Sequence, residues 1–239
     1  MGPLNRLEIN VAPGKSADSA QVVLLIDGRD LLAWRGNQGF GPEELLHTGN
    51  PLIPTDPPRR VALYLCACGV PGCGTIACVI SESAGVVHWS RFRDFVGVNH
   101  PLDMSIPDDA GRPVGLPDLA FDAAQYAAEV ERATTDRSWE TRRLRIVRLL
   151  KERLAERPER WQQLGIEFRS LWLWDEENEI FAVNLRRAGD QLLIGVRAPQ
   201  AVDEDTAVNA MAAEVLGGDE RKWSVIYDQR QPSLPADPP

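Results

Sequence analysis

Three cysteines fall within eight residues of this chain, at Cys66, Cys68 and Cys73, and their thiols are the side chains best suited to chemistry. Thiolates bind soft or borderline metal ions such as zinc, and they also form disulfides or act as nucleophiles. The glycines between them predict a tight turn, so this run is interpreted as the tip of a β-hairpin. If Cys68 lies opposite Cys73 there, the three sulfur atoms converge at the open end of one face.

The fourth cysteine, Cys78, is expected to be different. The predicted strands of the hairpin are Val61–Cys66 and Thr75–Ile80, and side chains alternate between the two faces along a strand. In this register Cys66 lies opposite Thr75 on the ligand face, while Cys78 falls on the other face among aliphatic residues. Cys78 is therefore predicted to be a buried core thiol and not a ligand.

A structural zinc site needs four ligands, so three cysteines leave one to find. His88 is the preferred candidate because it lies on the next predicted strand, and His47, His100 or a carboxylate are the alternatives. The spacing C-x-C-x4-C is not a common zinc-finger spacing, and two other interpretations therefore stay open. Cys68 and Cys73 could form a redox pair, or the thiols could have no chemical role.

Residues 66–74 read Cys-Ala-Cys-Gly-Val-Pro-Gly-Cys-Gly, and residues 87–92 read Val-His-Trp-Ser-Arg-Phe. This combination of a C-x-C-G-x-x-G-C-G hairpin with a strand ending V-x-W-S-x-F resembles uncharacterised bacterial proteins, especially actinobacterial ones. The resemblance covers residues 61–92, about an eighth of the chain. It implies no activity, because none is known for that family.

The charge of the chain disfavours nucleic acid as a partner. The net charge is −9 and the pI is near 4.9, whereas nucleic-acid binding needs a basic face. One segment is opposite in sign, because nine basic residues and only four glutamates lie between Arg137 and Arg160. This segment is interpreted as a solvated helix face, with an anionic-ligand surface over Arg142–Arg160 as the alternative. The acidic remainder suits a protein partner with a basic surface.

The hydrophobic pattern predicts an α+β protein. Its hydrophobic content of 44% is that of a soluble globular chain, no window approaches the ~18 apolar residues of a membrane span, and no signal peptide is recognisable. The expected location is therefore cytoplasmic, without membrane contact. Residues 1–100 are expected to form a β-rich part with the cysteine hairpin, followed by a Pro/Gly linker or long loop over 101–117. A helical pair is expected over 118–160. An antiparallel α+β meander with one packed helix follows over 161–231, and a disordered tail over 232–239.

Two local details follow from the same pattern. Ser138 is a plausible N-cap for the second helix of the pair. Trp172 and Trp174 share one face of a strand whose other face is also apolar, and such a strand is normally covered on both sides.

No motif identifies a catalytic residue. Pro13-Gly14-Lys15-Ser16 lacks the first glycine of a P-loop, because Ile9 stands in its place. The sequence therefore predicts a binding or regulatory protein that acts through protein contacts, with zinc as the one cofactor the cysteine hairpin could hold. The alternative is a zinc-dependent or thiol-redox enzyme that uses Cys66, Cys68 and Cys73.

Overall fold

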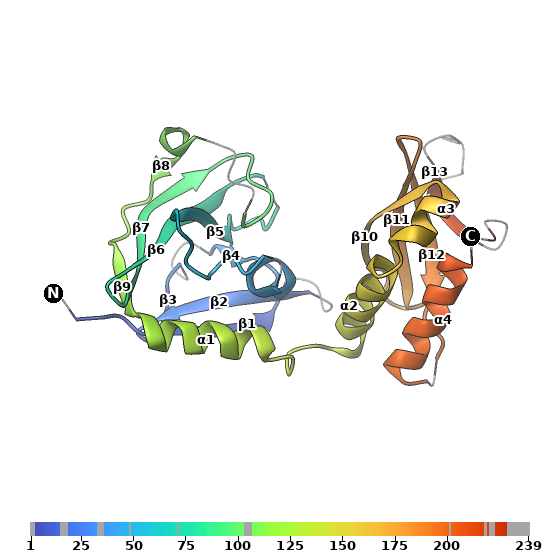
Figure 1. Cartoon of the computed structure of the whole chain (residues 1–239), viewed down its shortest axis with the longest axis horizontal. Helices are drawn as coiled ribbons and strands as arrows, with labels where there is room; N and C mark the ends of the chain where they lie inside the picture. The colour runs from blue at the N-terminus through green and yellow to red at the C-terminus, as the bar shows by residue number, and fades with distance from the viewer. Residues whose placement is uncertain are drawn as a thin grey trace. The chain divides into compact units, whose positions relative to one another are not determined.

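The structure is a computed structural model, and it contains two compact units, residues 1–139 and 140–239 (Figure 1). The described residues are 3–14, 19–32, 36–47, 49–70, 72–102, 107–200, 202–217, 219 and 223–228. Lys15 and Ser16 of the P-loop-like run and the predicted tail 232–239 lie outside them. Each unit has its own buried apolar core, and each is described by itself below.

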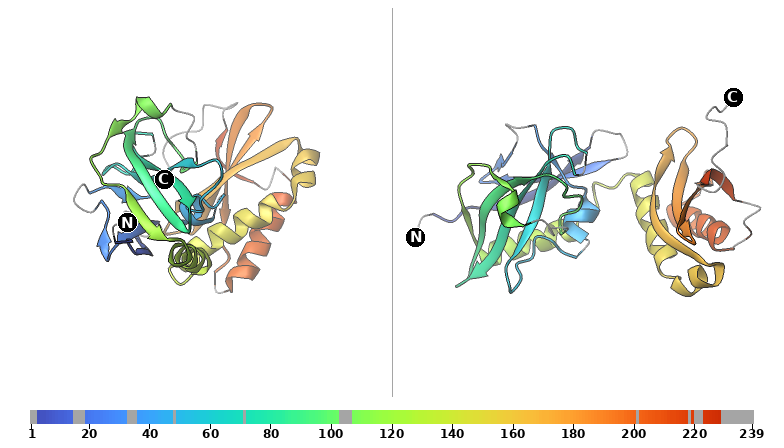
Figure 2. Two further views of the ribbon diagram at one scale, coloured as in Figure 1. Left: turned by 60° about the vertical axis from the view of Figure 1, so that its left-hand side comes forward. Right: turned by 90° about the horizontal axis from the view of Figure 1, so that it is seen from above.

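Two antiparallel sheets and one helix form the N-terminal unit (Figures 1 and 2). The smaller sheet has the order β1 (Leu7–Pro13), β2 (Ala20–Ile26), β3 (Arg29–Asp30). The larger sheet has the order β4 (Gln38–Gly39), β5 (Arg59–Leu65), β6 (Thr75–Ser83), β7 (Val86–Phe95), β8 (Arg112–Pro113), and β9 (Leu119–Asp122) also pairs with β7. A π-helical turn at Glu43–His47, a 3-10 turn at Asp108–Ala110 and the helix α1 (Ala123–Thr135) complete it.

Side chains of α1 cover the free edge of β1. The amide side chain of Gln125 both accepts from the N–H of Leu7 (3.2 Å) and donates to its carbonyl oxygen (2.7 Å). One turn further along, the Glu129 carboxylate accepts from the N–H of Ile9 (2.6 Å). Unpaired backbone groups at a sheet edge invite pairing with another chain, and α1 satisfies them here.

The segment 101–117, expected as a linker or long loop, lies within the N-terminal unit. Its strand β8 pairs with the end of β7, with Pro113 opposite Arg93. At its start, the carbonyl oxygen of Pro101 accepts from the N–H of Ala62 on β5 (3.0 Å). The boundary between the two units falls later, after Trp139, so that α1 belongs to the N-terminal unit.

The C-terminal unit is a four-stranded antiparallel sheet with three helices. The strands follow one another in chain order as β10 (Ile166–Asp175), β11 (Ile180–Arg187), β12 (Asp190–Arg197) and β13 (Ser224–Asp228). The helices are α2 (Arg142–Ala155), α3 (Pro158–Leu164) and α4 (Glu204–Leu216). This arrangement, together with the β-rich N-terminal unit, confirms the predicted α+β class and the C-terminal meander.

The core of the C-terminal unit forms where α2 and α4 meet one face of the sheet. Ile146, Leu150 and Leu154 recur every four residues on α2 and are fully buried. They pack in one cluster with alternate residues of β11 such as Phe181 and Val183. The apolar residues at every fourth position of α2 and those at every second position of β11 therefore form one buried layer.

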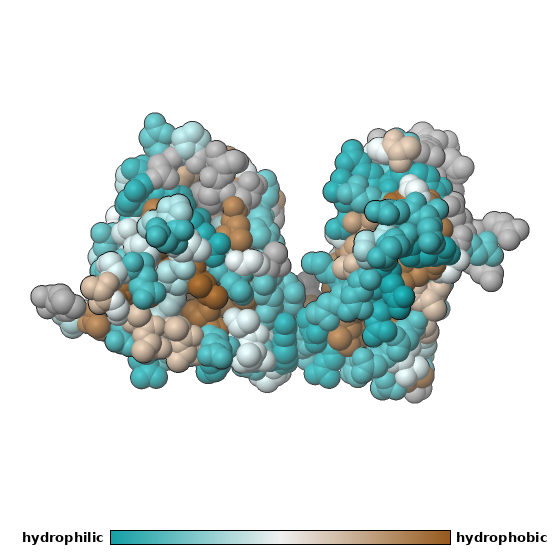
Figure 3. Space-filling model, viewed as in Figure 1, coloured by the Kyte–Doolittle hydropathy of each residue, from teal (hydrophilic) through white to brown (hydrophobic). Residues whose placement is uncertain are grey.

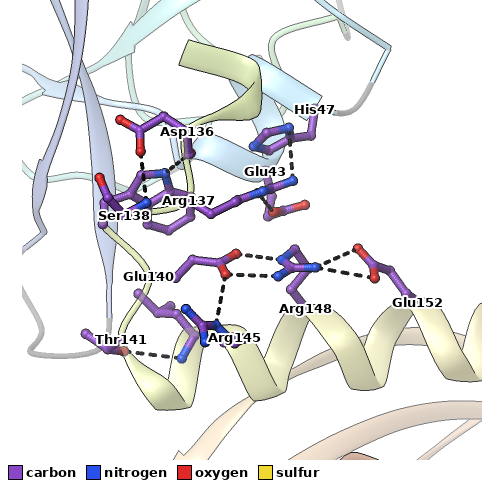
Figure 4. A network of polar contacts seen from close by, with 12 residues as sticks. Glu43, His47, Asp136, Arg137, Ser138, Glu140, Thr141, Arg145, Arg148 and Glu152 are labelled. Atoms are coloured by element: carbon purple, nitrogen blue, oxygen red, sulfur yellow. Dashed lines mark hydrogen bonds and ion pairs between the residues drawn. The ribbon is translucent and has the colours of Figure 1, made fainter. Parts of the chain in front are cut away.

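The start of α2 differs from the prediction. Ser138 is not its N-cap, because the helix begins after Thr141, whose hydroxyl accepts from the N–H of Leu144 (3.3 Å) (Figure 4). The carboxylate of Asp136 accepts from the N–H of Ser138 (2.9 Å), and this turn occupies the segment before the helix. A residue caps a helix only from the position directly before its first turn, and Ser138 lies earlier, in the turn formed with Asp136.

The tryptophans of β10 are less covered than predicted. Trp172 is half-buried, and the Trp174 side chain is 53% exposed. β10 is an edge strand of its sheet, and the helices cover the face with Leu171, whereas the two tryptophans are not part of that core cluster among the described residues. Among the helices described, none is both long and apolar enough to cross a membrane.

Candidate metal centre

The cysteine turn joins β5 to β6, but its register differs by one residue from the prediction. Leu65 and Thr75 are the last pair of the ladder, and the N–H of Cys66 donates to the carbonyl oxygen of Gly74 (2.8 Å). Cys66 therefore lies opposite Gly74 and not opposite Thr75. The hydroxyl of Thr75 is buried and donates to the carbonyl oxygen of Val98 (3.3 Å), so it takes no part in the cluster.

Two tight turns make up the tip. In the first, the N–H of Gly69 donates to the carbonyl oxygen of Cys66 (2.9 Å), and in the second the N–H of Cys73 donates to that of Val70 (3.2 Å). Gly69 and Gly72 have φ of 72° and 80°, a region that favours glycine. A Cβ atom would also lie 2.7 Å from the Gln38 side chain at Gly69 and 2.8 Å from Asn99 at Gly72. The conformation of the turn therefore requires glycine at positions 69 and 72.

The sulfur atoms of Cys66, Cys68 and Cys73 all lie within 4.8 Å of one another, so their predicted convergence is confirmed. The Cys66 and Cys68 sulfurs are in hydrogen-bond contact at 2.8 Å. Cys68 and Cys73 are exposed and Cys66 is half-buried. The three cysteines therefore lie within metal-binding distance at a place that solvent reaches.

Backbone hydrogen bonds hold the turn against its neighbours. The N–H of Gly72 donates to the carbonyl oxygen of Val98 (2.9 Å), and the N–H of Gly97 donates back to Gly72 (2.8 Å). On the other side, the Gln38 amide donates to the carbonyl oxygen of Ala67 (2.8 Å). A ligand set held by neighbouring strands and loops needs little reorganisation when it binds a metal.

The pKa values of Cys66 and Cys73 shift in opposite directions. The hydrogen bond between the Cys66 and Cys68 sulfurs lowers the pKa of Cys66 from its usual value. Hydrogen bonds with Cys66 and Cys68, and then the negative charge of those groups, raise the pKa of Cys73 to about 11. Of these two thiols, Cys66 therefore ionises more readily than usual and Cys73 less readily.

The structure does not bring His88 to the cysteines. On β7 it pairs with Ser81 on one side and with Ala120 of β9 on the other. The cysteine end of β7 is at Phe95, and seven residues at about 3.3 Å each separate the two by roughly 23 Å. The sequence placed His88 on the neighbouring strand, but only the ladder register shows that it lies towards the opposite end.

The other two histidines are also outside the cluster. His47 lies in the π-helical turn, where its Nδ1 is 3.3 Å from the guanidinium of Arg137 (Figure 4). His100 follows β7, and its Nδ1 accepts from the N–H of Leu102 (3.2 Å). Among the described residues, no histidine or carboxylate joins the three sulfurs within 4.8 Å.

Asp94 is a neighbour of the turn that the sequence analysis missed. A Cβ atom built on Gly74 would lie 3.3 Å from the Cys66 Cβ and 3.6 Å from a carboxylate oxygen of Asp94. Arg112 of β8 forms an ion pair with Asp94 at 3.1 Å. No spacing in the sequence could have indicated this neighbour, because it depends on the pairing of β6 with β7.

Cys78 is fully buried on β6 opposite Val61, which confirms the prediction of a core thiol. Burial raises the pKa of its thiol. Burial keeps reagents away from the Cys78 sulfur, and the raised pKa reduces the fraction of reactive thiolate, so Cys78 should be unreactive in the folded chain.

We expect a thiol reagent to modify three cysteines in the folded, metal-free protein and the fourth only on unfolding. The fast group is Cys66, Cys68 and Cys73, within which Cys73 reacts last because its pKa is raised, and the slow one is Cys78. A stopped-flow titration with a chromogenic disulfide, with and without denaturant, measures both phases. The Cys78→Ala variant is the control and should lose only the slow phase. A fast phase of four thiols in the parent chain would contradict the assignment.

Apart from the cysteine turn, the N-terminal unit has a hollow beside α1, with a volume of about 430 Å³. Apolar side chains reach the surface over this part of the unit (Figure 3), and Ile53, Val87 and Val130 are among those that line the hollow. The buried Tyr126 hydroxyl donates to the carbonyl oxygen of Leu52 (2.7 Å). The Thr134 and Thr135 hydroxyls in its lining likewise donate to backbone carbonyl oxygens of α1 (2.7 and 3.0 Å).

Comparison of the chain with protein-family models, with curated proteins and with solved structures found no match. The fold and the site together define an antiparallel α+β protein with an exposed three-cysteine cluster. The resemblance of residues 61–92 to actinobacterial proteins and the expected protein partner both stay predictions.

Proposed function

We propose that this protein binds one zinc ion through Cys66, Cys68 and Cys73 and leaves the fourth position of the metal to water or to an external ligand. The observation that carries this proposal is the convergence of three thiols within 4.8 Å at an exposed turn. Thiolate sulfur favours zinc and other soft or borderline ions over magnesium and calcium.

The dimensions of the cluster suit this ion. Zinc–sulfur bonds are about 2.3 Å long, so sulfurs at the corners of a tetrahedron are roughly 3.8 Å apart. The 2.8 Å between Cys66 and Cys68 and the 4.8 Å limit for the whole set lie on either side of that value. Small side-chain rotations would therefore be sufficient for binding.

The open fourth position supports a role for the metal beyond stabilising the turn. Structural zinc sites have four protein ligands, whereas sites that act on another molecule have three and a water. The described residues supply three. The alternative of a zinc-dependent enzyme requires such a position for its substrate. The predicted regulatory role is paired with a structural zinc and does not require it, although a side chain of the partner could occupy it.

Thiol exchange is the second candidate function, and the lowered pKa of Cys66 supports it. The Cys66 thiolate would attack a disulfide of another protein and form a mixed disulfide, releasing one thiolate of that protein. Cys68, whose sulfur lies 2.8 Å away, would then attack the Cys66 sulfur, which releases the second thiolate and leaves a Cys66–Cys68 disulfide, in place of the Cys68–Cys73 pair predicted from the sequence.

Metal analysis tests the proposal. Untagged protein purified without chelator should contain one zinc ion per chain by mass spectrometry, and Cys68→Ser should bind zinc at least about 100-fold more weakly. Binding should release protons, Cys73's among them, and affinity should therefore rise with pH, which calorimetry in buffers of different ionisation enthalpy measures. X-ray absorption should detect three sulfur ligands and one lighter atom.

Two controls separate the alternatives. Cys78→Ala removes a cysteine outside the cluster, and His88→Gln removes the predicted fourth ligand; both should retain zinc. Four free thiols without bound metal in the parent chain would contradict zinc binding. Two free thiols without metal, restored to four by a reductant, would support thiol exchange instead.

A further inference from the structure

The C-terminal unit has a hollow of about 430 Å³ between the last turns of α2 and α4, far in sequence from the cysteine turn. Arginines from α2 and from the start of α3 line one side, and α4 lines the other. The residues that matter here are Arg153, Arg157, Arg160, Asn209, Ala212 and Leu216. This hollow contains the end of the basic segment that the sequence analysis identified.

The structure divides that basic segment into two groups. In the first group, glutamates neutralise the guanidinium groups. Arg142 contacts Glu179 at 2.9 Å, and Arg148 contacts Glu140 at 2.6 Å. Arg137 belongs to the N-terminal unit, where it contacts Glu43 at 3.0 Å. These arginines are therefore part of the protein's own ion pairs and are poor candidates for binding an external anion.

The second group lines the hollow and has few acidic partners. Among the described residues, the Arg157 guanidinium has no hydrogen-bond or ion-pair partner. Arg153 donates to the amide oxygen of Asn209 (2.7 Å), and its ion pair within the described chain is with the exposed Glu156 at 3.9 Å, which is weak.

Arg160 is held in place by the end of α4. Its guanidinium donates to the carbonyl oxygens of Leu216 (2.7 Å) and Gly217 (3.1 Å) and to the side chain of Gln163 (3.1 Å). A guanidinium has five N–H donors, so two remain after these three bonds. Arg160 is therefore already positioned and keeps donors for a ligand.

We infer that this hollow binds a small organic phosphate monoester, with the phosphate on the three guanidinium groups and the organic part on α4. Guanidinium groups match the geometry and charge of phosphate oxygens. Ala212 is buried and Leu216 half-buried on the α4 side, and they offer an apolar surface to the rest of the ligand. The volume lies in the range of small-molecule sites.

The local grouping of three arginines favours a small ligand over a nucleic acid. Nucleic acids bind along extended basic surfaces, and here the neighbouring arginines of α2 are already paired with glutamates. The net charge of −9 also opposes a long polyanion, whereas a single phosphate needs only a local positive site.

Titration of the full chain with phenyl phosphate, followed by two-dimensional NMR, tests this inference. We expect a Kd on the order of a millimolar, in keeping with a ligand of this size. Inorganic phosphate should bind more weakly, because it lacks the apolar part, and phenol should not bind. The Arg157→Gln variant should weaken phenyl phosphate binding about tenfold, since one charge-assisted contact is lost. The Arg157 guanidinium has no hydrogen bond or ion pair to lose within the described chain, so this variant should fold normally.

Lys151→Gln is the matched control. Lys151 is exposed on α2 and does not line the hollow, so its removal changes the net charge equally but should leave Kd within a factor of two or so. Equal weakening by both variants would mean general electrostatic attraction and would overturn the site. An unchanged Kd in Arg157→Gln would do the same. Tighter binding of single-stranded DNA than of phenyl phosphate, lost in both variants, would instead assign the face to a polyanion.

Discussion

Replacing Trp89 by alanine should destabilise the N-terminal unit by about 3–5 kcal/mol, the largest effect expected of a single change in this chain. Trp89 lies on β7 and is fully buried. Its ring packs edge-on against Phe121 and Tyr126, with centroids 5.2 and 6.1 Å apart. Its indole N–H donates to the Tyr126 hydroxyl (3.1 Å), which in turn donates to the carbonyl oxygen of Leu52.

The loss has two physical sources. Removal of the ring leaves a cavity between β7, β9 and α1 that the well-packed neighbours can fill only in part. It also removes the donor that orients the buried Tyr126 hydroxyl. Tyr126→Phe separates these effects, because it keeps the ring but leaves the Trp89 N–H and the Leu52 carbonyl without this partner, and it should cost about 2 kcal/mol.

Calorimetry combined with hydrogen exchange measures the effect, because exchange assigns each transition to one unit. Trp174→Ala is the control, since that side chain is 53% exposed, and it should change stability by less than about 0.5 kcal/mol. A loss below about 1 kcal/mol in Trp89→Ala would refute the central position of this ring in the core.

The second large effect is expected at Glu140, where Glu140→Gln should destabilise the C-terminal unit by about 3 kcal/mol. The Glu140 side chain is only 1% exposed, and its two carboxylate oxygens accept from Arg148 at 2.6 and 2.9 Å (Figure 4). Arg145 approaches the same carboxylate at 3.7 Å. The carboxylate raises the pKa of the Arg148 guanidinium, so this charge persists at any working pH.

The destabilisation arises mainly from the charge left behind. Glutamine keeps the shape of the side chain but cannot neutralise Arg148, whose side chain is 18% exposed. A buried pair is often no more stable than an apolar substitute, while a buried charge without its partner is costly. The double variant Glu140→Gln with Arg148→Met should therefore recover part of the stability lost by Glu140→Gln alone.

Chemical denaturation of the four variants in the cycle gives the coupling energy directly. Glu152→Gln is the matched control, because Glu152 also pairs with Arg148 but is 53% exposed, and it should cost less than about 0.5 kcal/mol. If Glu140→Gln were no more destabilising than Glu152→Gln, the buried pair would contribute nothing to stability.

Local patterns were sufficient to predict much of the fold. The apolar runs Val61–Cys66 and Thr75–Ile80 predicted the strands β5 and β6, and the helical pair expected over 118–160 corresponds to α1 and α2. Short apolar runs bounded by turn residues favour strands, and a buried helix face imposes its period on the sequence. The glycine-rich turn between two apolar runs predicted the hairpin for the same reason. Helix capping was less predictable, since Ser138 and Thr141 are both good caps and the turn at Asp136 decided between them.

The candidate site was predicted in part. Closely spaced cysteines in a tight turn must lie near one another, and so the convergence of Cys66, Cys68 and Cys73 followed from spacing. The fourth position did not, because the distance from His88 to the turn depends on the register of β7 with β6. Nor could the sequence show which arginines are neutralised, since the partner of Arg142 is Glu179, 37 residues away along the chain.

The sequence by itself determined the α+β class, the cysteine turn and the burial of Cys78, because each depends on contacts within a few residues or on one strand period. Only the tertiary structure decided that, among the described residues, no histidine or carboxylate joins the three cysteines, that Trp174 is exposed on an edge strand, and that the basic segment ends in a hollow. These properties depend on strand register and on packing between distant segments, and those long-range contacts leave no local pattern in one sequence.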